Sequence, residues 1–452
     1  MQLNKKSYAA ALSVATCALL GNQAHAETEP DTWKFDSAVM YYGEQGRVQA
    51  LEGIFAAKKT FENSETLDLK VTFDTLTGAS ANGAVPQSTI QTFTRPSGNG
   101  NYQVKPGDTP LDDTFRDTRV QFNAQWTQPW SRLYTVSGGV HLSNEYDYLS
   151  MGVNGSIARD LNNRNTTLMA GASLSYDIIH PEGGLPMPYS SMSASIGEED
   201  DEYGNWFQPS SGNLAEFAFR DDDGEDDDDE EYNASRGAKD DSKVIVDLLF
   251  GVTQVINKNM ITQFNYSYSQ VDGYQTDPFK VLSVVDDTGT ALDHIYESRP
   301  NKRTKQSVFA QAKYHVSGSV IDASYRYLWD DWQVKSDTID LRLWTPVGSS
   351  SYLEPHVRYY QQQAAEFYMP FIAADSALPN YASADYRVGD MTATTLGVKY
   401  GQRNEDGTEW SVRVEWYHQQ SNDVGVTLPG QLQQYDLYPD VDAVVIQYGY
   451  RF

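Results

Sequence analysis

Two groups of charged residues in this sequence could do chemistry. The first is an acidic run between residues 198 and 241, with 18 acidic and three basic side chains. Carboxylate oxygens are the ligands that Ca²⁺ and Mg²⁺ prefer. Weak binding of divalent cations is therefore predicted at Asp221, Asp223, Glu225, Asp227 and Asp229. The spacing of a calcium-binding hand is absent, and a solvated loop that only attracts counterions is the simpler interpretation.

The second group consists of single charged residues that alternate with apolar ones. Lys70, for example, lies between Leu69 and Val71. In a strand, successive side chains point to opposite faces, so the charges share one face. Facing lipid they would be very costly, so they are predicted to line the interior of a barrel. The predicted lumen-lining residues are Lys70, Arg119, Asp247, Lys313, Arg326, Asp340, Arg342, Arg358, Lys399, Arg413 and Glu415.

Catalysis is the alternative use of the polar residues. After residue 26 the histidines are His141, His180, His294, His315, His356 and His418. None lies in a G-x-S-x-G sequence or has the spacing of metal ligands. Only His356, next to the predicted inward residue Arg358, could belong to a polar site. The sequence predicts no enzyme, no cofactor and, because its one cysteine is Cys17, no disulfide.

The elements that position these charges are about sixteen segments, each about ten residues long, with apolar and polar residues in alternation. Connections of two to five residues alternate with longer ones, of which 78–115, 179–241 and 273–303 are the longest. This pattern predicts an all-β fold, a closed antiparallel transmembrane β-barrel of 14–18 strands with short periplasmic turns and long external loops. Segment 78–115 is the candidate for an inward constriction or plug. A soluble β-sandwich is the alternative, but the apolar faces carry Ala and Gly midway and Tyr or Trp at their ends, as in a lipid-facing stripe.

The ends of the chain favour export and membrane assembly. Residues 1–26 resemble a signal peptide, with Lys5 and Lys6, an apolar core and an Ala24-His25-Ala26 cleavage site. We expect residues 27–452 to form the barrel, with 198–241 as an acidic external loop. The last alternating segment ends at Phe452, where the barrel-assembly machinery is expected to bind. Outer-membrane lipid is the other expected partner. The net charge, 34 − 62 = −28, argues against nucleic acid. The oligomeric state is not indicated.

Two stretches carry a family resemblance. They are Leu76-Thr77-Gly78-Ala79-Ser80-Ala81-Asn82-Gly83-Ala84 and Pro355-His356-Val357-Arg358-Tyr359-Tyr360. Together with shorter matches over nearly the whole mature chain, they resemble the family catalogued as domain of unknown function 3570. The resemblance implies an exported bacterial protein, an outer-membrane barrel without an assigned activity.

The charged lumen leaves two main functions open. Opposed rows of arginine and carboxylate in a pore would select small polar solutes or ions, so a porin-like channel is favoured. The same residues could instead form salt bridges that fill a non-conducting barrel, which would serve as a sleeve or scaffold for a periplasmic or surface partner. An outer-membrane hydrolase is less favoured than either.

Overall fold

The structure, a computed structural model, describes residues 32–95, 100–192 and 237–452. Its largest part is a closed barrel of sixteen antiparallel strands, whose order around the ring follows the order of the chain. The last barrel strand pairs with the first, with Tyr450 opposite Ser37, so the ring has no free edge. Closure satisfies the backbone N–H and C=O groups of every strand, which hydrocarbon cannot do. The predicted all-β fold class is confirmed.

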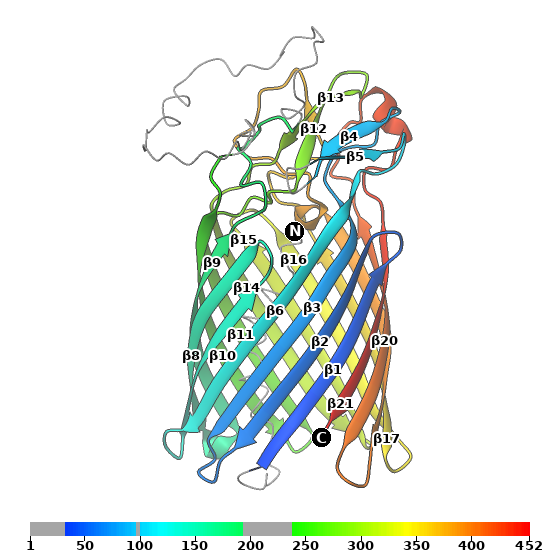
Figure 1. Ribbon diagram of the computed structural model, residues 1–452. Coiled ribbons are helices and arrows are strands. Elements are labelled where there is room, and N and C mark those ends of the chain that lie inside the picture. Colours follow the sequence, from blue (N-terminus) through cyan, green and yellow to red (C-terminus); the bar gives the residue numbers. More distant parts are fainter. Residues whose placement is uncertain (1–31, 96–99, 193–236) are drawn as a thin grey trace, which may run out of the picture.

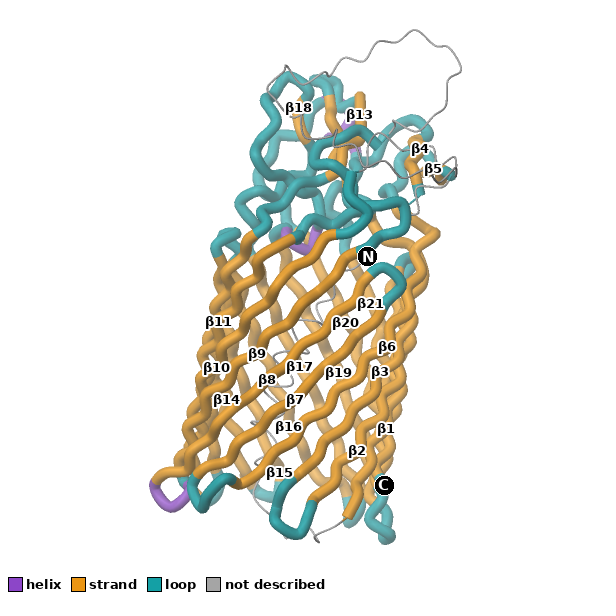
Figure 2. Tube along the Cα trace, turned by 60° about the vertical axis from the view of Figure 1, so that its left-hand side comes forward, coloured by secondary structure: helices purple, strands orange, loops and turns teal. Residues whose placement is uncertain are grey.

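The barrel strands are long enough to cross a bilayer at a tilt, as Figure 2 shows. They are β1 (Thr32–Glu44), β2 (Val48–Thr60), β3 (Thr66–Ala81), β6 (Leu111–Pro129), β7 (Tyr134–Asn144), β8 (Tyr148–Leu161), β9 (Thr166–Ile179), β10 (Asp241–Asn257), β11 (Met260–Gly273), β14 (Lys302–Val316), β15 (Ser319–Asp330), β16 (Lys335–Val347), β17 (Ser351–Gln362), β19 (Met391–Arg403), β20 (Glu409–Ser421) and β21 (Val441–Arg451). Across the described ranges, none of the helices is long and apolar enough to span a membrane.

The outer surface of the ring is apolar. Large hydrophobic side chains such as Leu51, Phe73 and Val357 point outward and are nearly half exposed. A soluble protein would bury such residues against each other, whereas a membrane barrel presents them to lipid. The alternation that marks each strand in the sequence is therefore the alternation between lipid and lumen.

The two ends of the barrel differ in their connections (Figure 1). At the end where β21 stops, the turns are short: 61–65, 130–133, 162–165, 258–259, 317–318, 348–350 and 404–408. Turn 162–165 holds the short 3-10 helix η1 (Asn162–Arg164). In the two-residue turn 317–318, Ser317 and Gly318 both have positive φ, 49° and 85°. This matches the twist that a tight hairpin requires. The other end carries the long connections and is the external end of this fold class.

The long connections fold together above the ring into a unit that we call the cap (Figures 1 and 2). The cap comprises the described parts of 82–110, 180–240, 274–301, 363–390 and 422–440. It contains a three-stranded sheet of β12 (Val281–Val285), β13 (Ala291–Tyr296) and β18 (Ile372–Ala373). A hairpin of β4 (Gln91–Thr94) and β5 (Asn101–Val104) and the 3-10 helices η3 (Tyr386–Val388) and η4 (Gly430–Gln434) complete it.

The conventional hydrophobic core lies in the cap. Leu282, Val284, Ile295, Ile372 and Ala382 form one buried cluster, and Val85, Val285, Phe371 and Leu432 form another. These clusters join segments from four external connections, which the sequence indicated only as loops. Because the apolar faces of the barrel strands meet lipid, the cap is where apolar residues can pack against each other.

Segment 78–115, the candidate for an inward constriction or plug, lies outside the lumen in its described residues. β3 and β6 continue as a paired ribbon to Ala81 and Leu111, which shortens the connection, and the β4–β5 hairpin lies in the cap (Figure 1). Phe93 and Tyr102 pack there against Val281 and Tyr296. These apolar side chains find an apolar core in the cap and would find only polar groups in the lumen.

Two predicted regions lie outside the described residues. They are the signal peptide, 1–26, and residues 198–236 of the acidic loop. The predicted cation ligands Asp221, Asp223, Glu225, Asp227 and Asp229 belong to the second region.

Candidate functional site

The residues predicted to line the lumen all lie on the strand face opposite the lipid-exposed side chains. Each of the eleven has an exposed large hydrophobic residue one position away, such as Val71 beside Lys70, Val246 beside Asp247 and Val414 beside Arg413. Because successive side chains point to opposite faces, the charges point inward. The ring therefore encloses a charged interior.

The most connected part of this interior spans β16, β17 and β20. Arg342 Nε lies 3.1 Å from Asp340 Oδ1. His356 Nε2 lies 2.9 Å from Asp340 Oδ2, and His356 Nδ1 lies 2.8 Å from Glu415 Oε1. A neutral imidazole has one N–H, so two carboxylate partners require the imidazolium form, which donates from both nitrogens. Arg413 Nε lies 3.8 Å from the same Glu415 oxygen.

A glycine makes this bridge possible. In the ring, His356 is opposite Gly397 of β19, which in turn is opposite Glu415. A Cβ at position 397 would lie 2.5 Å from Glu415 Cγ. The missing side chain lets Glu415 lie across β19 and reach His356. The sequence pointed to His356 without its partners, because Asp340 and Glu415 come from other strands.

Several other predicted lumen residues are paired. Lys313 Nζ lies 3.5 Å from Asp322 Oδ2, and Arg119 Nε donates to Asp74 Oδ2 at 2.8 Å. Asp247 accepts a 2.9 Å hydrogen bond from Ser173, and the Lys399 ammonium lies 5.5 Å from the centre of the Tyr352 ring. Lys70 and Arg358 instead expose much of their surface to the interior. The barrel therefore encloses open polar space beside these two residues.

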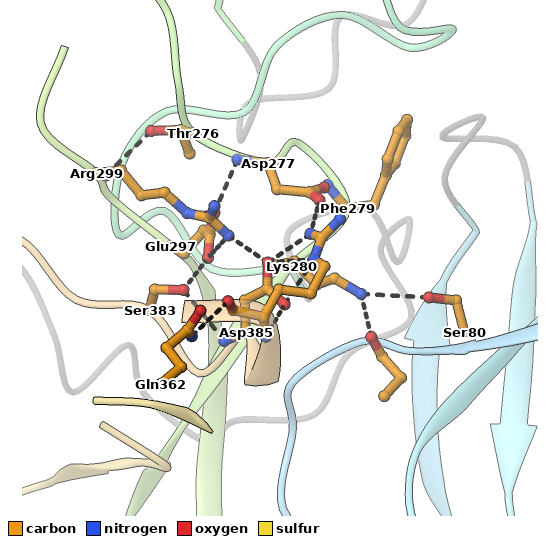
Figure 3. Close-up of polar contacts among 12 residues, drawn as sticks. Ser80, Thr276, Asp277, Phe279, Lys280, Glu297, Arg299, Gln362, Ser383 and Asp385 are labelled. Atoms are coloured by element: carbon orange, nitrogen blue, oxygen red, sulfur yellow. Dashed lines mark hydrogen bonds and ion pairs between the residues drawn. The ribbon is translucent and has the colours of Figure 1, made fainter. Parts of the chain in front are cut away.

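The cap contains a second charged cluster, which the sequence reasoning missed (Figure 3). We call it the latch: Asp277, Lys280, Glu297, Arg299, Asp385 and Arg387. The side chains of Asp277, Glu297 and Asp385 are fully buried. Arg299 lies 2.6 Å from Glu297 and 2.7 Å from Asp385. Arg387 Nε donates to both Asp385 oxygens, at 2.8 and 2.7 Å, and its Nη2 pairs with Asp277.

The latch carboxylates respond differently to burial. Burial raises the pKa of Asp385, but Arg387 and Arg299 outweigh it and hold that pKa well below the usual range. Burial also raises the pKa of Asp277, but the positive charges near it, Arg387 first and then Lys280, together outweigh burial and lower that pKa. For Glu297, burial outweighs the attraction of Arg299, and the pKa is raised. Breaking such a network leaves buried charges without partners, so the latch fixes the cap in one arrangement.

The latch also bridges the barrel mouth. Lys280 Nζ bonds the Ala81 carbonyl and lies 3.4 Å from Ser80 Oγ, at the end of β3. Gln362, at the end of β17, donates to the carbonyls of Arg387 and Gly389 at 3.0 and 2.8 Å. β3 and β17 are third and thirteenth in the ring, so they lie 16 − (13 − 3) = 6 strands apart, where eight is the largest separation. A cluster that contacts the external ends of both β3 and β17 must pass over the opening between them.

A third cluster lies at the external rim between β6 and β8. Oxygens of Asp117, Glu145 and Asp147 all lie within 4.8 Å of one another. Arg119 Nε lies 4.0 Å from Glu145 Oε1. Burial, and then Asp117, raise the pKa of Glu145 to about 8. A proton on Glu145 therefore reduces the repulsion between these carboxylates at neutral pH.

A closed antiparallel barrel with an apolar outer face and a charged interior is a transmembrane β-barrel of the outer-membrane type. Within this class, the chain belongs to the family described as "Protein of unknown function (DUF3570)", whose model matches residues 9–452. The family resemblance noted in the sequence is confirmed.

The similar solved structures are also barrels, at low identity. A "Bacterial polysaccharide outer membrane secretin" is 9% identical, with a TM-score of 0.41, 94% of this chain covered and 100% of that one. A loop-deletion mutant of OmpT, an outer membrane protein of Vibrio cholerae, is 10% identical, with a TM-score of 0.37 and coverages of 93% and 98%. The ferric enterobactin receptor mutant (Q482A) of Pseudomonas aeruginosa is 8% identical, with a TM-score of 0.42 and coverages of 93% and 61%. No curated protein matches the chain.

Proposed function

We propose that this outer-membrane barrel is a channel for small polar solutes or ions. The observation that carries the proposal is that Lys70 and Arg358 point into a closed ring and are nevertheless exposed. Inside a barrel such exposure requires space filled by water, and barrels of sixteen strands commonly enclose an aqueous channel. Charges of both signs on the walls would give that channel its preference for polar solutes.

The cap supports a specific mode of control. Because the latch joins two connections above the mouth and contacts the ends of β3 and β17, solutes enter beside the cap or when it shifts. The lumen offers the conducting path, and the cap limits which solutes reach it. Lipid and the assembly machinery that binds the strand ending at Phe452 are the partners that this function needs.

The second candidate function is a non-conducting scaffold. The bridged mouth is the observation that favours it, since a latch of buried charges holds the cap across the opening. In that case the cap would present a fixed surface to an external partner.

Planar bilayer recordings separate the two functions. Purified full-length protein is added to bilayers in KCl, and the variant Arg387→Met, which breaks the latch, is recorded under the same conditions. The channel predicts discrete current steps that become larger or more frequent in the variant. Silence of both proteins at every voltage would refute the channel and favour the scaffold.

A further inference from the structure

One wall of the lumen, close to the cap, presents hydrogen-bond donors without acceptors. Arg326 of β15, Thr338 of β16 and Gln419 of β20 point inward, and Arg326 Nε, Thr338 Oγ1 and Gln419 Nε2 are buried without a partner. Gln419 is only 3% exposed. Arg358 of β17 has no hydrogen bond or ion pair to any residue that the structure describes. We call these four residues the donor row.

The strand register brings the donor row together. Arg326 is opposite Thr338, and Thr338 is opposite Tyr360 of β17. Tyr360 is opposite Ala393 of β19, which is opposite Gln419. Arg358 lies on the same face as Tyr360, two residues along β17.

The row has excess positive charge. Arg326 is opposite Thr338 and Arg358 is opposite Asp340, the next inward residue of β16, so the two arginines project from the strands on either side of β16. Asp340 is opposite Arg358 in the register, but its oxygens already bond Arg342 and His356. Glu44 accepts a 2.8 Å hydrogen bond from Tyr42 on the far side of β20. Among the described residues, neither carboxylate is hydrogen-bonded to either of the two guanidinium groups.

We propose that the donor row is a binding site for an oxyanion, with the carboxylate or phosphate chemistry of a small solute. Unpaired buried donors are unfavourable, and a guanidinium presents a fork of N–H groups that fits two oxygens of such an anion. Thr338 and Gln419 supply neutral donors beside the charged ones. The inference rests on the proposed function in one respect: the bound oxyanion is taken to be the solute that passes through the lumen.

The site lies directly below the cap. Tyr360 Oη donates to Gln362 Oε1 at 2.6 Å, and the Gln362 amide donates to the Arg387 and Gly389 carbonyls. Tyr360 and Gln362 thus link the strand that carries Arg358 to the segment that carries the latch. An anion that passes the cap meets this row first, before the paired charges around His356.

Equilibrium dialysis with radiolabelled inorganic phosphate tests the site without requiring conduction. Full-length protein in detergent micelles is compared at low ionic strength with Arg326→Gln/Arg358→Gln and with Thr338→Val, which removes one hydroxyl at nearly constant shape. Arg403→Gln, which removes an exposed cation at a turn of the opposite end, is the matched control. Circular dichroism and heat-dependent gel mobility show whether each variant is folded.

We expect phosphate to bind the wild type. The affinity of the double variant should be lower by about tenfold or more, and that of Thr338→Val should be lower by a few-fold. Binding by Arg403→Gln should match the wild type. Absence of binding by the wild type, or unchanged binding by a folded double variant, would overturn the site. Binding without conduction in bilayers would refute the channel alone, and conduction without binding would refute the site alone.

Discussion

Replacing Arg387 with methionine should unlock the cap and leave the barrel intact. Arg387 contacts Asp277 from one loop and Asp385 from its own, and both carboxylates are fully buried. The methionine keeps most of the volume of the side chain and removes the positive charge. Asp277 then has lost its guanidinium partner, while Asp385 keeps the Arg299 guanidinium and the backbone N–H of residue 387.

The size of the effect follows from burial. Removing one partner of a buried ion pair costs about 3–5 kcal/mol, because the remaining charge is left without compensation. At about 1.4 kcal/mol for each factor of ten, opening of the cap should become roughly 100-fold to several thousand-fold more frequent. Exposed pairs contribute at most about 1 kcal/mol. The pair Arg403–Glu409, in which the arginine is 64% exposed, therefore provides the control Arg403→Met.

Hydrogen exchange followed by mass spectrometry is the assay. Peptides from 274–301 and 363–390 should lose protection by about two orders of magnitude or more in Arg387→Met, while peptides from β7 to β9 stay protected. The variant Arg403→Met should leave both regions unchanged. Equal protection of the cap in wild type and Arg387→Met would refute the latch, and a parallel loss of protection in the barrel would show that the cap is not a separate unit.

Three further predictions concern other parts of the molecule. Burial lowers the pKa of His294 in β13 to about 4. The contribution of His294 to cap stability is therefore complete above pH 6.5 and is lost as the pH falls toward 4. Proteolysis within 274–301 should accelerate over that pH range, and the acceleration should be smaller in His294→Gln. The pKa of Glu145 is raised to about 8, so its contribution has the opposite sign: it is present below about pH 4.5 and is lost as the pH rises toward 8. Urea unfolding of Glu145→Gln should lack this part of the pH dependence. Gly397→Ala places a methyl group 2.5 Å from Glu415 Cγ and should destabilise the barrel by about 1–3 kcal/mol in urea. Gly53→Ala, whose methyl group meets only the Phe73 carbonyl at 3.9 Å, should be nearly neutral; equal effects of the two variants would contradict the role of Gly397.

The barrel was predictable because the membrane acts as its solvent. Lipid on one side and a polar interior on the other impose the same two-residue alternation on every strand, so segments such as Val444–Phe452 reveal their orientation without any long-range information. The predicted number of strands and the inward direction of Arg342 and Arg358 follow from this local rule. Closure follows because an open edge is not tolerated in hydrocarbon.

The cap was not predictable by the same rule. Asp277 and Arg387 are 110 residues apart and lie in connections without periodicity, so no local pattern indicates that they meet. The apolar run Val281-Leu282-Ser283-Val284-Val285 is the one signal, since it is too apolar for a solvated loop. The donor row has the same difficulty: no pattern in the sequence indicates that Arg326 Nε and Thr338 Oγ1 are buried without a partner among the described residues.

Cysteine accessibility tests the central claim most directly, namely that the charged faces line a water-filled interior and the apolar faces meet lipid. The only native cysteine is Cys17, so Cys17→Ser leaves a clean background for Val357→Cys and Arg358→Cys, neighbours on opposite faces of β17. In proteoliposomes, a charged water-soluble maleimide should label position 358 and leave position 357 unlabelled, and Lys70→Cys and Val71→Cys should behave in the same way. Labelling of 357 and 71 in preference to 358 and 70 would contradict the account.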